Sequence, residues 1–208
     1  MSELVVLDRP AAGEPDGVLV VLHGRGADEH DLFPLLDALD PERRLAGFAP
    51  RGPLSLPPGG AHWYALHQVG APDPETFRST FALVSDWLDE VAPDAGRLWL
   101  AGFSQGAVMS YALGLGAERP RPAGILAFSG FIPRVPGFEL GLESRAGLPV
   151  SIAHGSVDPM IGVEFGREAR DLLTAAGLDV RYREDPAPHM ITAEGLAQAR
   201  AVLEEDRR

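Results

Sequence analysis

The stretch that decides the fold reads Leu98-Trp99-Leu100-Ala101-Gly102-Phe103-Ser104-Gln105-Gly106. It predicts a buried strand that runs into a Gly-x-Ser-x-Gly turn and then directly into a helix. Such a turn presents the serine hydroxyl at its tip, and the two glycines let strand and helix approach closely around it. The start of the helix also supplies the free backbone amide of Gln105, where an oxyanion can be held. Ser104 is therefore the candidate nucleophile, and the alternative is a glycine-rich turn around a buried serine.

Strands alternate with helices on both sides of this turn. The apolar run 18–22 is typical of a strand buried on both faces of a parallel sheet. We expect strands at 4–7, 18–23, 45–49, 97–103, 124–128, 149–154 and 180–183, and helices at 28–39, 75–92, 105–115, 162–176 and 193–205. The proline- and glycine-rich segment 50–74 is expected to be mostly irregular. The pattern predicts an α/β fold with a doubly wound, mostly parallel sheet and helices on both faces. We expect a single domain over residues 1–208, without an insertion long enough to form a separate lid.

A catalytic serine needs a positioned base and an acid partner. Of the six histidines, only His189 follows the last predicted strand, on a short loop flanked by prolines. Asp158 follows the strand 149–154, so the chain order Ser104, Asp158, His189 matches the Ser…Asp…His order of this fold class. Asp185 is a weaker candidate for the acid. Taken singly, Asp158 could form an ordinary Asp-Pro turn and His189 could be a surface histidine, but the three positions together favour a triad.

A second oxyanion donor is expected from a loop after an earlier strand. The stretch His23-Gly24-Arg25-Gly26 follows the buried strand 18–23, and its glycines let the backbone approach a ligand. We expect the donor to be the backbone amide of Arg25 and His23 to be structural. The alternative is a simple glycine-rich connection between strand and helix.

The chain resembles the carboxylesterase/phospholipase family of small α/β-hydrolases that includes the acyl-protein thioesterases. The resemblance rests on LHGRGADEHDL, APRGP…HWY, AGFSQGAVMSYAL, AFSGFIP, HGSVDPMI and the final histidine, in the family's order from about residue 18 to residue 189. It implies the α/β-hydrolase fold and esterase or thioesterase activity without a metal or cofactor. It also implies oxyanion donors at Arg25 and Gln105 and acyl-pocket residues at Trp63 and Phe131. Arg25 stands where the thioesterases often have leucine.

Several apolar side chains fall on loops at the expected carboxyl edge of the sheet, where open α/β sheets bind ligands. We expect Trp63, Phe131 and Met160 to contact substrate there. For the neighbouring side chains Tyr64, Ile132 and Met190, packing of the loops is an equal alternative.

Composition excludes several other functions. The 208 residues carry a formal charge of −12, which disfavours nucleic acid and anionic membrane surfaces as partners. The absence of cysteine excludes disulfides and a cysteine nucleophile, and since all 18 basic residues are arginine, no mechanism can use a lysine. We expect a cytoplasmic protein without stable membrane association. A homodimer is compatible with the sequence.

These features lead to a serine hydrolase that cleaves carboxylic esters or thioesters through an acyl-enzyme on Ser104. Small soluble esters of short to medium acyl chain are the expected substrates. Alternatives on the same fold are a lysophospholipase, an acyl-protein thioesterase, a peptidase and a lactonase. The alternative from another class is a catalytically silent binding protein.

Overall fold

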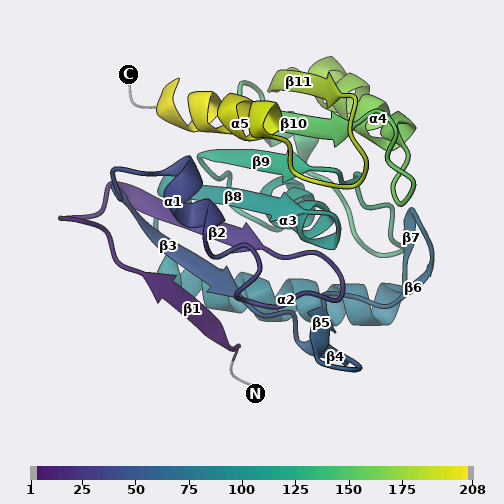
Figure 1. The fold of residues 1–208 in the computed structure, drawn as a ribbon, viewed down its shortest axis with the longest axis horizontal. Helices are drawn as coiled ribbons and strands as arrows, with labels where there is room; N and C mark the ends of the chain where they lie inside the picture. Colours follow the sequence, from purple (N-terminus) through teal and green to yellow (C-terminus); the bar gives the residue numbers. More distant parts are fainter. Residues whose placement is uncertain (1–3, 206–208) are drawn as a thin grey trace.

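The computed structural model describes residues 4–205 and is built around a seven-stranded sheet (Figure 1). In spatial order the strands are β1 (Val6–Arg9), β3 (Leu45–Pro50), β2 (Gly17–Leu22), β8 (Leu98–Phe103), β9 (Gly124–Phe128), β10 (Pro149–Gly155) and β11 (Asp179–Asp185). Every neighbouring pair is parallel except β1 and β3, which are antiparallel. The expected mostly parallel sheet is thus present, and it places the carboxyl ends of six strands at one edge.

Helices cover both faces of the sheet, as the alternation of strands and helices predicts. They are α1 (Leu35–Leu39), α2 (Pro74–Val91), α3 (Gln105–Leu115), α4 (Val163–Ala175) and α5 (Ala193–Glu205), with short 3₁₀ turns at Ala95–Arg97 and Leu142–Ser144. The α1 and α5 helices lie on one face, and α2, α3 and α4 lie on the other (Figure 1). None of the helices within residues 4–205 has the length and apolarity needed to cross a membrane.

Alternation along β2 explains why both faces need cover. Val20 and Leu22 pack with residues of α2 and α3, whereas Leu19 and Val21 pack with α1 and α5. All four side chains are at most 1% exposed. Burying an aliphatic side chain of this size contributes about 1.5–3 kcal/mol to the stability of the fold. A strand that is apolar on both faces is therefore stable only where helices cover both faces of the sheet.

The segment 50–74 contains more regular structure than its prolines predict. Two short hairpins form, β4 (Leu54–Leu56) with β5 (Gly60–His62), and β6 (Leu66–Gln68) with β7 (Ala71–Pro72). The first hairpin is held by backbone bonds outside the segment. The amide of Gly26 donates to Ala61 over 2.8 Å, and the amide of Ala61 donates to Ala27 over 2.7 Å. Long-range pairing of this kind leaves no signal in local composition, so the expectation of a mostly irregular segment was wrong here.

The helix expected from residue 28 is also wrong, because α1 comprises only Leu35–Leu39. The side chain of Asp28 accepts the amide of His30 over 3.0 Å, which closes a turn instead of capping a helix. Pro34 then stands immediately before α1, a position where its missing amide costs nothing.

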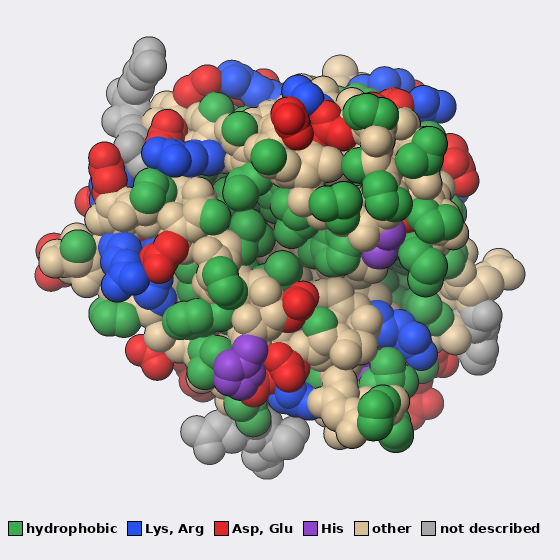
Figure 2. All heavy atoms as spheres, viewed as in Figure 1, with side chains coloured by type: hydrophobic (Ala, Val, Ile, Leu, Met, Phe, Trp, Pro, Cys, Tyr) green, Lys and Arg blue, Asp and Glu red, His purple; other side chains and the backbone are tan. Residues whose placement is uncertain are grey.

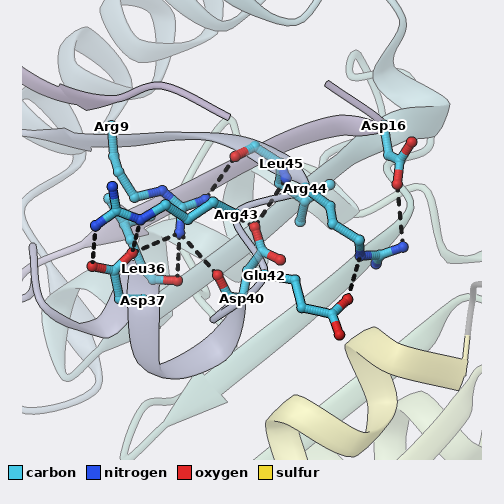
Figure 3. Close-up of polar contacts among 9 residues, drawn as sticks. All are labelled: Arg9, Asp16, Leu36, Asp37, Asp40, Glu42, Arg43, Arg44 and Leu45. Atoms are coloured by element: carbon cyan, nitrogen blue, oxygen red, sulfur yellow. Dashed lines mark hydrogen bonds and ion pairs between the residues drawn. The ribbon is translucent and has the colours of Figure 1, made fainter. Parts of the chain in front are cut away.

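A buried ion pair fastens the antiparallel edge strand β1 to the rest of the sheet (Figure 3). Arg9 is 4% exposed and its guanidinium bonds Asp40, whose side chain is 0% exposed, over 2.9 Å. Arg9 also donates to the carbonyls of Leu36 and Leu45 over 2.9 and 2.6 Å. Since Leu45 begins β3, this cluster lies at the amino edge of the sheet, opposite the carboxyl ends of the strands.

Candidate active site

Ser104 lies between the end of β8 and the start of α3, in a strained backbone conformation. Its φ is 56° and its ψ is −119°, and positive φ is uncommon for a residue with a side chain. The Ser104 amide donates to the carbonyl of Phe128 on the neighbouring strand over 3.0 Å, which holds the turn against the sheet. Residues held in such sparsely populated conformations cluster at functional sites.

The two glycines of the turn are required by space. A Cβ on Gly102 would overlap the backbone of Gly106, and a Cβ on Gly106 would overlap the carbonyl of Leu22 at the end of β2. The predicted reason for glycine at both positions, close approach of strand and helix, is therefore confirmed. The turn therefore packs tightly against both β8 and β2.

Asp158 and His189 are hydrogen-bonded to each other at the carboxyl edge of the sheet. Nδ1 of His189 donates to Oδ2 of Asp158 over 2.6 Å. Oδ1 of Asp158 accepts the amides of Met160 over 2.8 Å and Ile161 over 2.9 Å. The Asp158 side chain is 0% exposed, and that of His189 is 18% exposed. Both oxygens of the buried carboxylate thus accept hydrogen bonds, while the imidazole keeps contact with solvent.

Electrostatics keep Asp158 ionised. Burial acts to raise the pKa of Asp158, but the hydrogen bonds from His189, Ile161 and Met160 outweigh burial and lower it. Because an ionised carboxylate can only accept, Nδ1 of His189 carries a hydrogen, and in the neutral imidazole the lone pair is therefore on Nε2. This is the tautomer that a general base requires.

The ring of Phe103 brings His189 beside the serine turn. Phe103 directly precedes Ser104, and its ring lies 4.6 Å from the imidazole of His189, centroid to centroid. The three predicted triad positions therefore converge on one edge of the sheet. Phe103 was not singled out from the sequence, where it is simply the variable position before the serine.

The predicted oxyanion loop lies against the same turn. A Cβ on Gly24 would stand 3.5 Å from Cβ of Ser104 and 3.2 Å from the ring of Phe103. Within residues 4–205, no hydrogen-bond acceptor pairs with the backbone amide of Arg25 or with that of Gln105. The Arg25 side chain is exposed. Two unpaired amides next to a serine form an arrangement that can hold an oxyanion.

Trp63 is placed differently from the sequence expectation of a groove residue. It is 0% exposed, and its indole Nε1 donates to the carbonyl of His23 over 2.8 Å. The Gln105 side chain holds the loop from the other side, because it accepts the amide of Trp63 over 3.1 Å and donates to the carbonyl of Tyr64 over 2.8 Å. Trp63 thus supports the oxyanion loop from within the core. This role could not be predicted from local sequence, because it depends on the side chain of Gln105, which is 42 residues away in the chain.

The other two predicted substrate residues differ in their surroundings. Phe131 is 4% exposed and packs on Phe165 with ring centroids 5.5 Å apart, beside a cavity of about 80 Å³. Met160 is 61% exposed, and the loop methionine Met190 is 49% exposed. Of the three side chains expected to contact substrate, only Met160 offers its surface in this conformation.

Asp185, the weaker candidate for the acid, has other partners. Its carboxylate accepts from Arg183 over 2.6 Å and from the hydroxyl of Thr192 over 2.5 Å. The hydrogen bond from Arg183 lowers the pKa of Asp185 against the effect of burial. Asp185 therefore closes the loop that carries His189, whereas Asp158 contacts the imidazole.

A groove larger than the cavity beside Phe131 runs along α2 and the first hairpin. It has a volume of about 770 Å³ and is lined in part by Leu54, Leu83 and Trp87. Ser104, Asp158 and His189 are not among its lining residues, so its size alone does not mark it as the reaction site.

The sequence and the fold both resemble those of known proteins. The family described as Phospholipase/Carboxylesterase matches residues 9–205. The chain belongs to this family. Its relatives include the MhqD protein of Bacillus subtilis (strain 168), 30% identical over 93% of this chain and 95% of that protein. Acyl-protein thioesterase 1 of Gibberella zeae is 25% identical over 93% of this chain and 92% of that protein.

Solved structures agree with this assignment. The Bacillus cereus carboxylesterase superposes with a TM-score of 0.84 at 25% identity, covering 98% of this chain and 94% of that one. Membership of the phospholipase/carboxylesterase family confirms the α/β-hydrolase fold and the expected class of chemistry, cleavage of carboxylic esters by a serine hydrolase.

Proposed function

We propose that Ser104 is the nucleophile of this hydrolase, with His189 as general base and Asp158 as its acid partner. The observation that carries the proposal is the 2.6 Å hydrogen bond between Asp158 and His189 beside a strained serine turn. A protein that only bound ligands would have no need for a buried, ionised carboxylate that fixes one tautomer of a half-buried imidazole. This argues against the catalytically silent alternative.

The reaction proceeds through an acyl-enzyme. The Ser104 hydroxyl attacks the carbonyl carbon of the ester while Nε2 of His189 accepts its proton. Negative charge on the former carbonyl oxygen is held by the amides of Arg25 and Gln105. His189 then passes the proton to the leaving alcohol or thiol, and water repeats the sequence to release the acid.

Substrates are small esters whose apolar part lies on the face that carries α1 and α5. Hydrophobic side chains gather around a hollow in the middle of this face, with charged side chains around its rim (Figure 2). Half-buried apolar residues that pack against this side of the core include Leu32, Phe33, Phe103, Ile191 and Leu196. Since Phe103 also touches His189, this surface reaches the candidate base.

The resemblance to thioesterases gives the second candidate. Several relatives are named acyl-protein thioesterase 1, so thioesters belong among the substrates to be tested. A lysophospholipase remains the other alternative on this fold. A cytoplasmic location, a single domain over 1–208 and a homodimer stay predictions from the sequence.

The test is turnover of p-nitrophenyl esters from acetate to palmitate, together with labelling by a fluorophosphonate. Ser104→Ala and His189→Ala should each lower kcat by roughly 10³–10⁶ with the fold intact. Retention of full esterase activity by Ser104→Ala would refute the proposal. A profile that peaks at palmitate would leave the triad standing and refute only the choice of small esters.

A further inference from the structure

A second histidine, His154, lies close to the same carboxylate oxygen of Asp158 that bonds His189. His154 is the sixth of the seven residues of β10, and its side chain is 0% exposed. Its Nε2 donates to the carbonyl of Ile161 over 2.8 Å and stands 3.7 Å from Oδ2 of Asp158. Two imidazoles thus lie within 4 Å of Oδ2 of Asp158, and of the two only His189 is hydrogen-bonded to it.

The shared partner of His154 and Asp158 is Ile161. The carbonyl of Ile161 accepts from His154, and its amide donates to Oδ1 of Asp158 over 2.9 Å. Both polar backbone atoms of this residue are therefore occupied, one by the end of a central strand and one by the candidate acid. Through Ile161, the position of the loop 158–161 is coupled to the rigid sheet.

His154 is held neutral in a single tautomer. Burial lowers the pKa of His154, against the effects of the bond to Ile161 and of the nearby Asp158 charge. A carbonyl can only accept, so Nε2 carries the hydrogen and Nδ1 does not. Among the described residues, Nδ1 has no hydrogen-bond partner.

The fold accommodates this imidazole at a cost in stability. Gly166 lies inside α4, where glycine is among the least favourable residues, and a Cβ there would stand 2.7 Å from Nδ1 of His154. An unpaired buried nitrogen and a glycine inside a helix are both unfavourable, and an apolar side chain at 154 would avoid the first of them. Local costs that packing alone does not require are expected at functional sites.

We propose that His154 is a positioning residue for the proposed hydrolysis. Its Nε2–H holds Ile161, Ile161 holds Asp158, and Asp158 orients His189 toward Ser104. The proposal rests on the triad proposed above, since His154 itself reaches neither substrate nor the reacting atoms. Loss of the Nε2 donor should loosen the acid and lower kcat, with KM little changed because no substrate contact is removed.

The test compares His154→Gln with His154→Asn. Both variants place a neutral amide in the same buried site, but only the longer glutamine side chain can bring an N–H to the position of Nε2. We expect His154→Asn to lower kcat per folded molecule at least tenfold with KM within about twofold, and His154→Gln to stay within about threefold of the wild type. The folded fraction is measured by circular dichroism, and rates are measured with a p-nitrophenyl ester.

Ser151→Ala is the matched control, because Ser151 is buried on the same strand and bonds Gln198 instead of the loop of Asp158. It should lose stability without losing kcat per folded molecule. If His154→Asn does not fold, Gly166→Ala takes its place, since the new Cβ displaces the imidazole, and the same tenfold loss is expected. Equal kcat for the Gln and Asn variants, or an unchanged kcat for Gly166→Ala in that event, overturns the proposal. The triad is judged separately, by whether Ser104→Ala lowers kcat by roughly 10³–10⁶.

Discussion

The imidazole of His189 lies against the ring of Phe103, with centroids 4.6 Å apart and planes inclined by 38°. Asp158 holds the same imidazole through Nδ1, so the ring is fixed by a hydrogen bond at one atom and by an apolar contact over its face. Since Phe103 is the last residue of β8, the contact joins the proposed base to the strand that presents the nucleophile.

Removing this contact should loosen the base without removing it. We expect Phe103→Ala to lower kcat/KM by about tenfold, a loss of about 1.4 kcal/mol of transition-state stabilisation. Phe103→Tyr keeps the ring and serves as the control. An alanine variant as active as the tyrosine variant would show that Asp158 alone orients His189.

Strain at Ser104 predicts a trade of activity for stability. With φ at 56°, the side chain disfavours the backbone conformation that the turn imposes, whereas glycine adopts positive φ freely. Ser104→Gly should therefore abolish turnover and increase the free energy of unfolding by about 1 kcal/mol. Ser104→Ala keeps the Cβ and should abolish turnover without this gain. Thermal unfolding of the two variants decides the matter, and equal melting temperatures would contradict the prediction.

The pKa of Asp158 predicts how stability depends on pH. It is lower in the folded protein than the ordinary value of about 3.9 in an unfolded chain. The ionised group therefore stabilises the fold above that ordinary value, and the contribution is lost as pH falls through the lowered pKa. Asp158→Asn should be less stable than the wild type at pH 7, and the difference should shrink toward pH 3. Urea unfolding at both values measures it, and a constant difference would exclude this linkage.

The ion pair of Arg9 and Asp40 should matter for stability and not for catalysis. Arg9→Met leaves the carboxylate of Asp40 buried without its cation, which should cost about 3–5 kcal/mol. Arg9→Met with Asp40→Leu removes both charges and should recover most of that loss. Esterase activity per folded molecule should stay unchanged in both, because the pair lies at the opposite edge of the sheet. A single variant as stable as the wild type would contradict the assigned role.

Structural features that have a signal in the local sequence could be predicted. The apolar run into Gly102-Phe103-Ser104-Gln105-Gly106 predicts both the turn and its glycines, and the place of Asp158 and His189 after successive strands predicts their approach.

Residues whose roles depend on distant partners were not predictable in this way. Trp63 is an aromatic residue on a loop, as expected of a substrate-binding residue, yet it is buried and bonds His23 and Gln105. His154 ends a strand like any buried histidine, and only the fold brings Ile161 and Gly166 against it. Asp28 is a residue type that often caps helices, but its side chain accepts the amide of His30 and closes a turn. Residue propensity alone does not distinguish such a turn from the start of a helix.

All eleven residues of α3 are buried, in contrast to α4 and α5, which each expose one side. In a complete substitution library, tolerance of polar residues should therefore rise and fall every three to four positions along α4 and α5. Along α3 it should stay uniformly low, with no helical period. The helix that follows the proposed nucleophile should then change slowly in sequence between homologues, because its packing alone restricts every position.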